Sequence, residues 1–225
     1  MATCSDVSLY LCRISQWQTV PLAQLLEALS PDERKKCADF SHPDRQRSYA
    51  LGRYLLRQRL AVRLDCSPSK LTLCIGPHGR PELVNGEQYF NLSHSGDWLA
   101  LGFAARPLGV DIEVTRQQPR ARLLAKRFFA QSEYDDLASL APEEQTTAFL
   151  QLWCLKEAVL KAHGGGLQAG LARFSVQRHP PQLVLNQLDE HDYQLANWQM
   201  SDMHLALAIQ GAIPLPPLTP QWLSP

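Results

Sequence analysis

The chain has 225 residues, 45% of them hydrophobic and 20% charged, which is enough to bury a large core as one domain or as two of about 100 residues each. Its 22 basic and 22 acidic residues balance to a formal net charge of zero, which excludes a global attraction to nucleic acid or to an anionic membrane. No apolar run approaches the ~20 residues of a membrane span, and the N-terminus lacks the basic and apolar regions of a secretory signal, so we expect a cytoplasmic protein.

Strand and helix patterns alternate from the start of the chain. Residues 7–14 alternate apolar and polar side chains as a strand does, and residues 21–29 show a helical pattern. Ser30, Pro31 and Glu33 form the capping-box signature with which a second helix begins.

A long helix is predicted over residues 45–64, and it is rich in arginine. From Arg34 to Arg63 the chain carries nine Lys or Arg against only two acidic residues, Asp39 and Asp44. Most arginines on such a helix belong to a solvated face, but a basic block of this density also suits a bound anion.

Two strands and a histidine-containing loop follow. Residues 71–75 and 98–104 predict strands, and the second of them is apolar enough to be buried. Between them lie a turn rich in Gly and Pro at residues 76–81 and a predicted loop at residues 93–96, which places His94 among serine hydroxyls.

Three carboxylates and a lysine mark the second half. Residues 109–113 predict a strand, whose period of two places Asp111 and Glu113 on one face. Glu157 and Lys161 lie four residues apart on a helical pattern and also share a face. Oxygen donors without a Cys or His cluster suit a hard cation such as Mg²⁺. Taken singly, however, each of these short motifs is more often a solvated surface than a site.

Further helices are predicted around residues 122–129, from Ser132 and Glu133 onward, and over residues 142–163, where a run of three glycines ends the pattern. Neither a Gly-x-Gly-x-x-Gly loop nor a Gly-Lys-Ser/Thr loop occurs, so a phosphate would be held by metal, Lys, Arg and His. The proline-rich residues 214–220 are expected to be extended, either packed back on the protein or trailing from it.

The six cysteines show no Cys-x-x-Cys spacing, so we expect reduced thiols rather than disulfides or zinc ligands. A weak internal repeat relates residues 95–104 to residues 201–210, and a long helix precedes each segment. Chance similarity between two apolar strands is the alternative. The repeat predicts an α+β fold of two similar halves, residues 1–106 and 107–225, related by a pseudo-twofold axis, with a ligand site in the cleft between them.

Four motifs of this chain resemble those of a known family, the 4'-phosphopantetheinyl transferases. Gly109-Val-Asp-Ile-Glu113 and Trp153-Cys-Leu-Lys-Glu-Ala-Val-Leu-Lys161 resemble its two signature blocks, and Asn91-Leu-Ser-His-Ser-Gly96 and Gly79-Arg-Pro81 match its upstream motifs. The length and the duplicated halves resemble the larger, monomeric type that activates surfactin synthetase, and the likeness covers residues 29–208.

The resemblance implies an enzyme that moves 4'-phosphopantetheine from coenzyme A to a serine of an acyl or peptidyl carrier protein and releases adenosine 3',5'-bisphosphate. It implies Mg²⁺ bound by Asp111, Glu113 and Glu157, and Lys161 in contact with the phosphates. The coenzyme A contacts that it implies are Arg47, Arg53, Arg80, Ser93, His94, Lys156 and Lys161, with the register open between Arg45 and Arg47. The base for the serine hydroxyl is either Glu157 or Glu133, the latter acting through a water on the metal ion. Gly165 stands where many members carry a cation.

Other functions fit parts of this pattern. One is a different Mg²⁺-dependent phosphoryl transfer or hydrolysis on a nucleotide, and another is a coenzyme A or carrier-protein binding module without catalysis. For the carrier protein, residues 119–129 combine Arg120 and Arg122 with apolar side chains and are a candidate docking segment, although an amphipathic helix packed on its own domain has the same composition.

Overall fold

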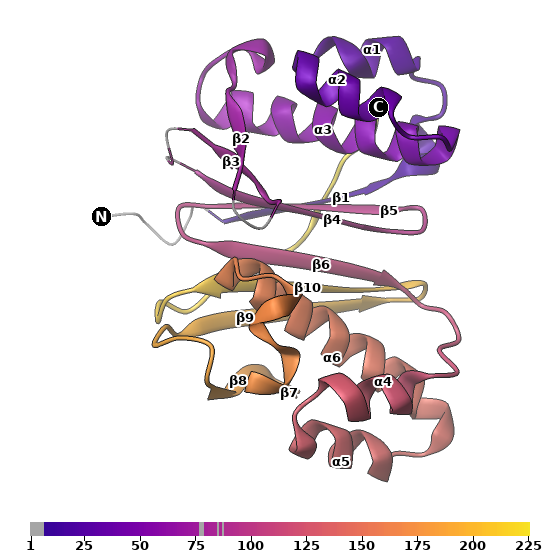
Figure 1. Cartoon of the computed structure of the whole chain (residues 1–225), viewed down its shortest axis with the longest axis vertical. Helices are drawn as coiled ribbons and strands as arrows, with labels where there is room; N and C mark the ends of the chain where they lie inside the picture. Colours follow the sequence, from indigo (N-terminus) through magenta and orange to yellow (C-terminus); the bar gives the residue numbers. More distant parts are fainter. Residues whose placement is uncertain (1–6, 77–78, 85, 87) are drawn as a thin grey trace.

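Two β-sheets that face each other form the centre of the molecule, and helices cover their outer faces (Figure 1). This computed structural model describes residues 7–76, 79–84, 86 and 88–225, apart from the side chain of Leu167. The predicted α+β class is confirmed. Part of the predicted turn at residues 76–81, namely 77 and 78, lies outside the described residues.

The first sheet has the strand order β11-β1-β5-β4. β5 lies between β1 and β4 and is antiparallel to both, whereas β11 pairs in parallel with β1. Its strands are β1 (Ser8–Arg13), β4 (Tyr89–Ser95), β5 (Trp98–Ala104) and β11 (Gln221–Trp222). His94 therefore lies in a strand and not in the predicted loop, because pairing with Leu99 extends β4 through Ser95.

The second sheet is antiparallel throughout and has the order β6-β10-β9. It consists of β6 (Leu108–Val114), β9 (Tyr193–Met200) and β10 (Met203–Gln210). Two small hairpins stand apart from the main sheets: β2 (Leu73–Ile75) with β3 (Pro81–Leu83), and β7 (Phe174–Arg178) with β8 (Pro181–Asn186).

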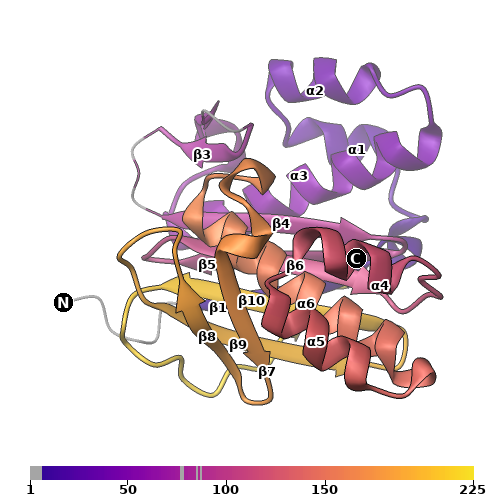
Figure 2. The same cartoon turned by 60° about the horizontal axis from the view of Figure 1, so that its bottom comes forward.

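One long helix covers the outer face of each sheet (Figures 1 and 2). α3 (Pro43–Arg63) packs on the first sheet together with α1 (Leu22–Glu27) and α2 (Pro31–Ala38). α6 (Pro142–His163) packs on the second sheet, with α4 (Ala121–Phe128) and α5 (Gln131–Ser139) beside its first turns. Single 3₁₀ turns occur at Ile14–Trp17, Pro68–Lys70, Leu167–Ala169 and Leu171–Arg173.

Two helix ends follow local chemistry that the sequence shows, and a third differs from the prediction. Ser30 accepts the Glu33 backbone N–H and its own N–H is bound by the Glu33 carboxylate, which confirms the predicted capping box. Gly164 ends α6 in the left-handed region, at φ 84°. Ser132, in contrast, does not cap α5: the helix begins one residue after Ala130.

The core between the sheets is made of alternate side chains from both of them. Leu9 and Leu11 of β1 meet Val110, Leu205 and Leu207 of the second sheet, and all are fully or almost fully buried. Because both faces of β5 and β10 are covered, neither strand alternates with polar residues, and each is a central strand of its sheet.

The C-terminal tail packs back on the protein. β11 joins the first sheet, Leu223 lies in the core beneath α3, and Leu215 and Leu218 pack against the core between the sheets. The segment predicted as the second half, residues 107–225, therefore contributes its last strand to the sheet of the first half. None of the described helices is long and apolar enough to cross a membrane.

Candidate active site

The site is built where the edge strands β4 and β6 run side by side. They are joined by side chains in place of a backbone ladder, because every second side chain of β4 accepts a hydrogen bond from a backbone N–H of β6. The pairs are Asn91 with Val110 at 2.8 Å, Ser93 with Ile112 at 3.4 Å and Ser95 with Val114 at 3.3 Å. We call this row of three side chains the β4 ladder.

The same hydroxyls hold the two carboxylates of β6. Ser93 Oγ donates to Asp111 Oδ1 at 2.9 Å, and Ser95 Oγ donates to Glu113 Oε2 at 2.8 Å. Neither contact was predicted, and Ser95 was not among the predicted site residues. The signal was in the sequence, since Asn91, Ser93 and Ser95 alternate with the period of a strand.

Helix α6 crosses β6 at very close range. A Cβ on Gly109 would lie 2.0 Å from the Ala158 carbonyl oxygen, so only glycine permits this approach. Lys161 Nζ thereby reaches Asp111 Oδ1 at 2.6 Å, and it also donates to Ser93 Oγ and to the Val110 carbonyl, each at 3.1 Å.

These groups line a cavity of about 390 Å³, which we call the acidic cavity. Its polar lining is Ser93, His94, Asp111, Glu113, Glu157 and Lys161, and Trp153 adds an aromatic wall. Burial raises the pKa of Glu157, and the neighbouring Asp111 raises it further. Burial also raises the pKa of Glu113, against the hydrogen bond from Ser95. The cavity therefore concentrates negative charge that its single lysine only partly balances.

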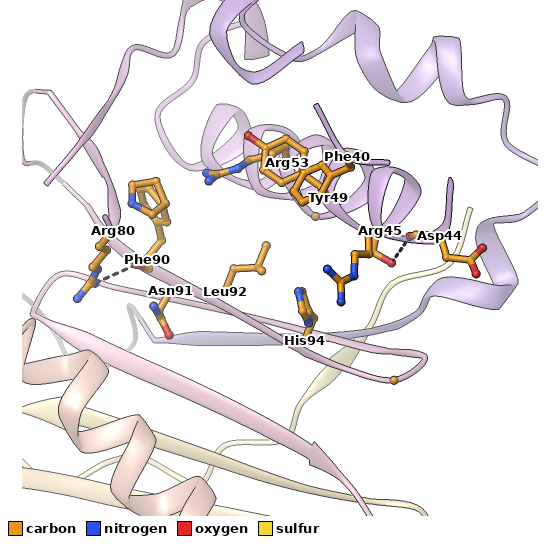
Figure 3. Close-up of a pocket in the computed structure, with 14 residues that line it drawn as sticks. Phe40, Asp44, Arg45, Tyr49, Arg53, Arg80, Phe90, Asn91, Leu92 and His94 are labelled. Atoms are coloured by element: carbon orange, nitrogen blue, oxygen red, sulfur yellow. Dashed lines mark hydrogen bonds between the residues drawn. The ribbon is translucent and has the colours of Figure 1, made fainter. Parts of the chain in front are cut away.

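A larger cavity of about 600 Å³ lies between α3 and β4, and we call it the basic cavity. Arg45, Tyr49 and Arg53 of α3 face Phe90, Leu92 and His94 of β4 across it (Figure 3). Leu92 and His94 line both cavities, so the two adjoin along β4.

Comparison with known proteins shows what kind of chain has this arrangement. The family model described as 4'-phosphopantetheinyl transferase superfamily matches residues 107–209, and the one described as 4'-phosphopantetheinyl transferase, N-terminal, matches residues 15–107. The 4'-phosphopantetheinyl transferase Sfp of Bacillus subtilis is 35% identical over 71% of this chain and 73% of its own. The chain belongs to the 4'-phosphopantetheinyl transferase superfamily.

Two further proteins are similar to this superfamily member. Another 4'-phosphopantetheinyl transferase of Bacillus subtilis is 32% identical over 85% of both chains. A solved structure of a holo-(acyl-carrier-protein) synthase from Bacillus anthracis matches 47% of this chain and 96% of its own, at 19% identity and a TM-score of 0.38.

Two of the arginines that the family resemblance suggested as coenzyme contacts are engaged with backbone carbonyls. Arg47 donates to the carbonyls of Trp17 and Val20 and does not line the basic cavity, whereas Arg45 does. Arg80 lines that cavity, but its guanidinium donates to the carbonyls of Lys161, Phe90 and Leu108 at 2.7 to 3.2 Å. Burial lowers the pKa of Arg80.

Lys156 and Glu133 pair with each other, away from both cavities. Lys156 Nζ is fully buried and donates to the two Glu133 oxygens at 2.8 and 2.6 Å and to the Phe174 carbonyl at 2.7 Å. Glu133 also accepts the N–H groups of Val176 and Ala130. The expected coenzyme contact by Lys156 and the expected base role of Glu133 both disagree with this placement, because neither group is free or exposed.

Proposed function

We propose that this chain transfers 4'-phosphopantetheine from coenzyme A to a serine of an acyl or peptidyl carrier protein and releases adenosine 3',5'-bisphosphate. The observation that carries the proposal is the junction of the basic and acidic cavities at His94. A molecule with a charged nucleotide and a pyrophosphate needs cationic and aromatic groups beside a place where phosphate charge is neutralised. Membership of the superfamily supports the same activity.

We further propose that Asp111, Glu113 and Glu157 hold Mg²⁺. Their donors are all oxygens, and Asp111 Oδ2 is buried without a hydrogen-bond partner, as expected of an oxygen kept for a cation. As they stand, no three His, Cys, Asp or Glu side chains of the described residues are arranged to hold a metal ion. Lys161 Nζ donates a hydrogen bond to Asp111 Oδ1 instead. When bound, Mg²⁺ would neutralise charge on the pyrophosphate oxygens.

The transfer forms a P–O bond from the carrier serine to the phosphorus that bears pantetheine, and breaks the bond from that phosphorus to the bridging oxygen of the leaving bisphosphate. Lys161, which lines the acidic cavity, would donate to phosphate oxygens. Of the two candidate bases for the serine proton, Glu157 is the one that lines the acidic cavity.

Arg45, Arg53 and His94 would bind the nucleotide end of coenzyme A. They line the basic cavity around the rings of Tyr49 and Phe40, and rings of this kind suit stacking with a base.

We also propose that the chain acts as a monomer in the cytoplasm, with its ligand site between the predicted halves 1–106 and 107–225. The five described cysteines are free thiols, in keeping with a reducing compartment.

The test is the mass of a purified apo carrier protein after incubation with this protein, coenzyme A and Mg²⁺. We expect a gain of one phosphopantetheine, and we expect Glu157→Gln to abolish it while the thermal unfolding temperature stays near that of the parent. Nucleotide breakdown without a gain in carrier mass would instead indicate another phosphoryl-transfer activity. Binding of coenzyme A without either product would indicate a binding module.

A further inference from the structure

The side chains of the β4 ladder join β4 to β6, and two of them also bind carboxylates. Each rung accepts a backbone N–H of β6, but only Ser93 and Ser95 also donate their hydroxyl hydrogen to a carboxylate. Asn91, the third rung, accepts the Val110 N–H at 2.8 Å and forms no hydrogen bond with a carboxylate among the described residues. The ladder therefore separates naturally into a rung that only joins the strands and two that also touch the acidic side chains.

The two hydroxyls decide which carboxylate oxygens are available. On Asp111, Oδ1 accepts from both Ser93 and Lys161, which leaves Oδ2 buried and without a partner. On Glu113, Ser95 occupies Oε2 and leaves the other oxygen for a ligand. Both hydroxyls are themselves fixed, because each accepts a hydrogen bond from the backbone of β6. A carboxylate held in this way keeps its rotamer even though its neighbours repel it.

We propose that Ser93 and Ser95 are positioning residues that preset Asp111 and Glu113 to bind a divalent cation. The inference rests on the proposed function, since it concerns the same site. In this role each serine acts through the carboxylate that it holds, and the coenzyme A contact that the family resemblance implies for Ser93 is a separate matter. Outer partners of metal ligands generally matter in this way, and removing one costs roughly 10–100-fold in metal affinity.

The experiment compares Ser95→Ala with Asn91→Ala in the full chain. Mn²⁺ is titrated into the protein without coenzyme A, and free Mn²⁺ is read by electron paramagnetic resonance, so that activity plays no part in the readout. Each variant loses one hydrogen bond from a backbone N–H of β6, and Ser95→Ala also loses the bond to Glu113, so we expect small decreases in unfolding temperature for both variants. We expect Ser95→Ala to bind Mn²⁺ about tenfold more weakly, and Asn91→Ala to bind it within about twofold of the parent.

A second variant, Ser95→Thr, keeps a hydroxyl at the same position and should recover most of the lost affinity. The proposal is overturned if Ser95→Ala binds Mn²⁺ like the parent, or if Asn91→Ala weakens binding as much as Ser95→Ala does, because strand joining alone would then explain the effect. If the parent loads carrier proteins and binds Mn²⁺ but Ser95→Ala is unchanged, only this inference fails. If the parent does neither, the proposed function fails with it.

Discussion

Side chains of α6 reach either the acidic cavity or the core, depending on the face of the helix on which they lie. Lys156 and Glu157 are neighbours in the sequence, but neighbours on a helix point about 100° apart. Glu157 and Lys161 therefore reach the acidic cavity, while Lys156 points into the core toward Glu133. The motif predicted Glu157 and Lys161 as a pair from their spacing. It could not predict the partner of Lys156, because that partner lies on another helix.

Lys156→Met should destabilise the fold strongly. Glu133 would be left as a buried carboxylate without its cation, and breaking such a pair costs about 3–5 kcal/mol. The free energy of unfolding from a urea titration measures the loss. The control is the double variant Lys156→Met with Glu133→Leu, in which no charge remains buried and much of the stability should return. Equal stability of Lys156→Met and the parent would show that the ion pair, which joins α5 and β7 to α6, does not stabilise the fold.

Arg45→Ala and Arg53→Ala should raise the KM for coenzyme A by about tenfold or more, because each removes a cation from the basic cavity, and should leave the KM for the carrier unchanged. Arg47→Ala is the matched control from the same helix. Its guanidinium binds two backbone carbonyls, so its loss should lower the unfolding temperature and change the KM for coenzyme A little. An unchanged KM for coenzyme A in both cavity variants would indicate that these arginines belong to an ordinary solvated face and do not bind the coenzyme.

At the scale of elements, most helices and strands were predictable, and what joins them was not. The periods of β6 and α6 predicted which side chains share a face. The distance between these two elements depends on Gly109, which has no Cβ, and no periodic pattern indicates how closely two elements approach. The β4 ladder was missed for a similar reason. Serines beside a histidine indicated a loop, whereas their hydroxyls replace a strand ladder between two sheets.

Gly109→Ala should separate α6 from β6. The new Cβ would lie 2.0 Å from the Ala158 carbonyl oxygen and 2.5 Å from the Ala162 nitrogen, and backbone atoms cannot move aside singly. We expect a large drop in unfolding temperature and loss of carrier loading. Gly52→Ala is the comparison, because its Cβ would meet only side chains of Leu92 and Leu99 and alanine favours a helix. Equal unfolding temperatures for the two variants would contradict the close packing of α6.

Helix α4 packs against the protein with one face and exposes the other to solvent. Ala121 and Ala125 are buried, whereas Arg122, Lys126 and Arg127 are exposed and Leu123 is 68% exposed. The helix thus packs on α5 and α6 and leaves a basic and apolar surface exposed, which we propose as the place where an acidic helix of the carrier docks.

Reversing Arg120 and Arg122 to Glu should lower kcat/KM for the carrier several-fold and flatten its dependence on salt, because charges at the rim of an interface act mainly on the rate of encounter. The KM for coenzyme A should stay constant, which is the internal control. Carrier kinetics that keep their magnitude and their salt response would place the docking surface elsewhere.

Across the whole molecule, the second predicted half supplies the outermost strand, β11, of the sheet in the first half. The similarity of residues 95–104 and 201–210 pointed to two α+β halves, and β5 and β10 do occupy central positions in separate sheets. The destination of the tail was not predictable, because a proline-rich segment has no periodic pattern to indicate a partner. Only the tertiary fold shows Leu223 in the core under α3.

Truncation after Ile213 should destabilise the first half more than the second. It removes β11, leaves β1 with an unpaired edge and uncovers the site of Leu223. Hydrogen exchange followed by mass spectrometry should show faster exchange in β1 and α3 than in β9, and Leu223→Ala alone should cost about 2–5 kcal/mol. Uniform exchange rates in the truncated chain would mean that the tail does not stabilise the first sheet selectively.

The pairing of the tail with β1 also constrains the order in which the protein folds during synthesis on the ribosome. β1 emerges before the other described strands, yet its parallel partner β11 follows all of them. Throughout most of synthesis the edge of β1 is open, and open edges are where nascent chains pair wrongly with one another. The first half therefore completes its fold only after the second half has been made, and slow translation of the segment between β10 and β11 would prolong the period in which the edge of β1 is open.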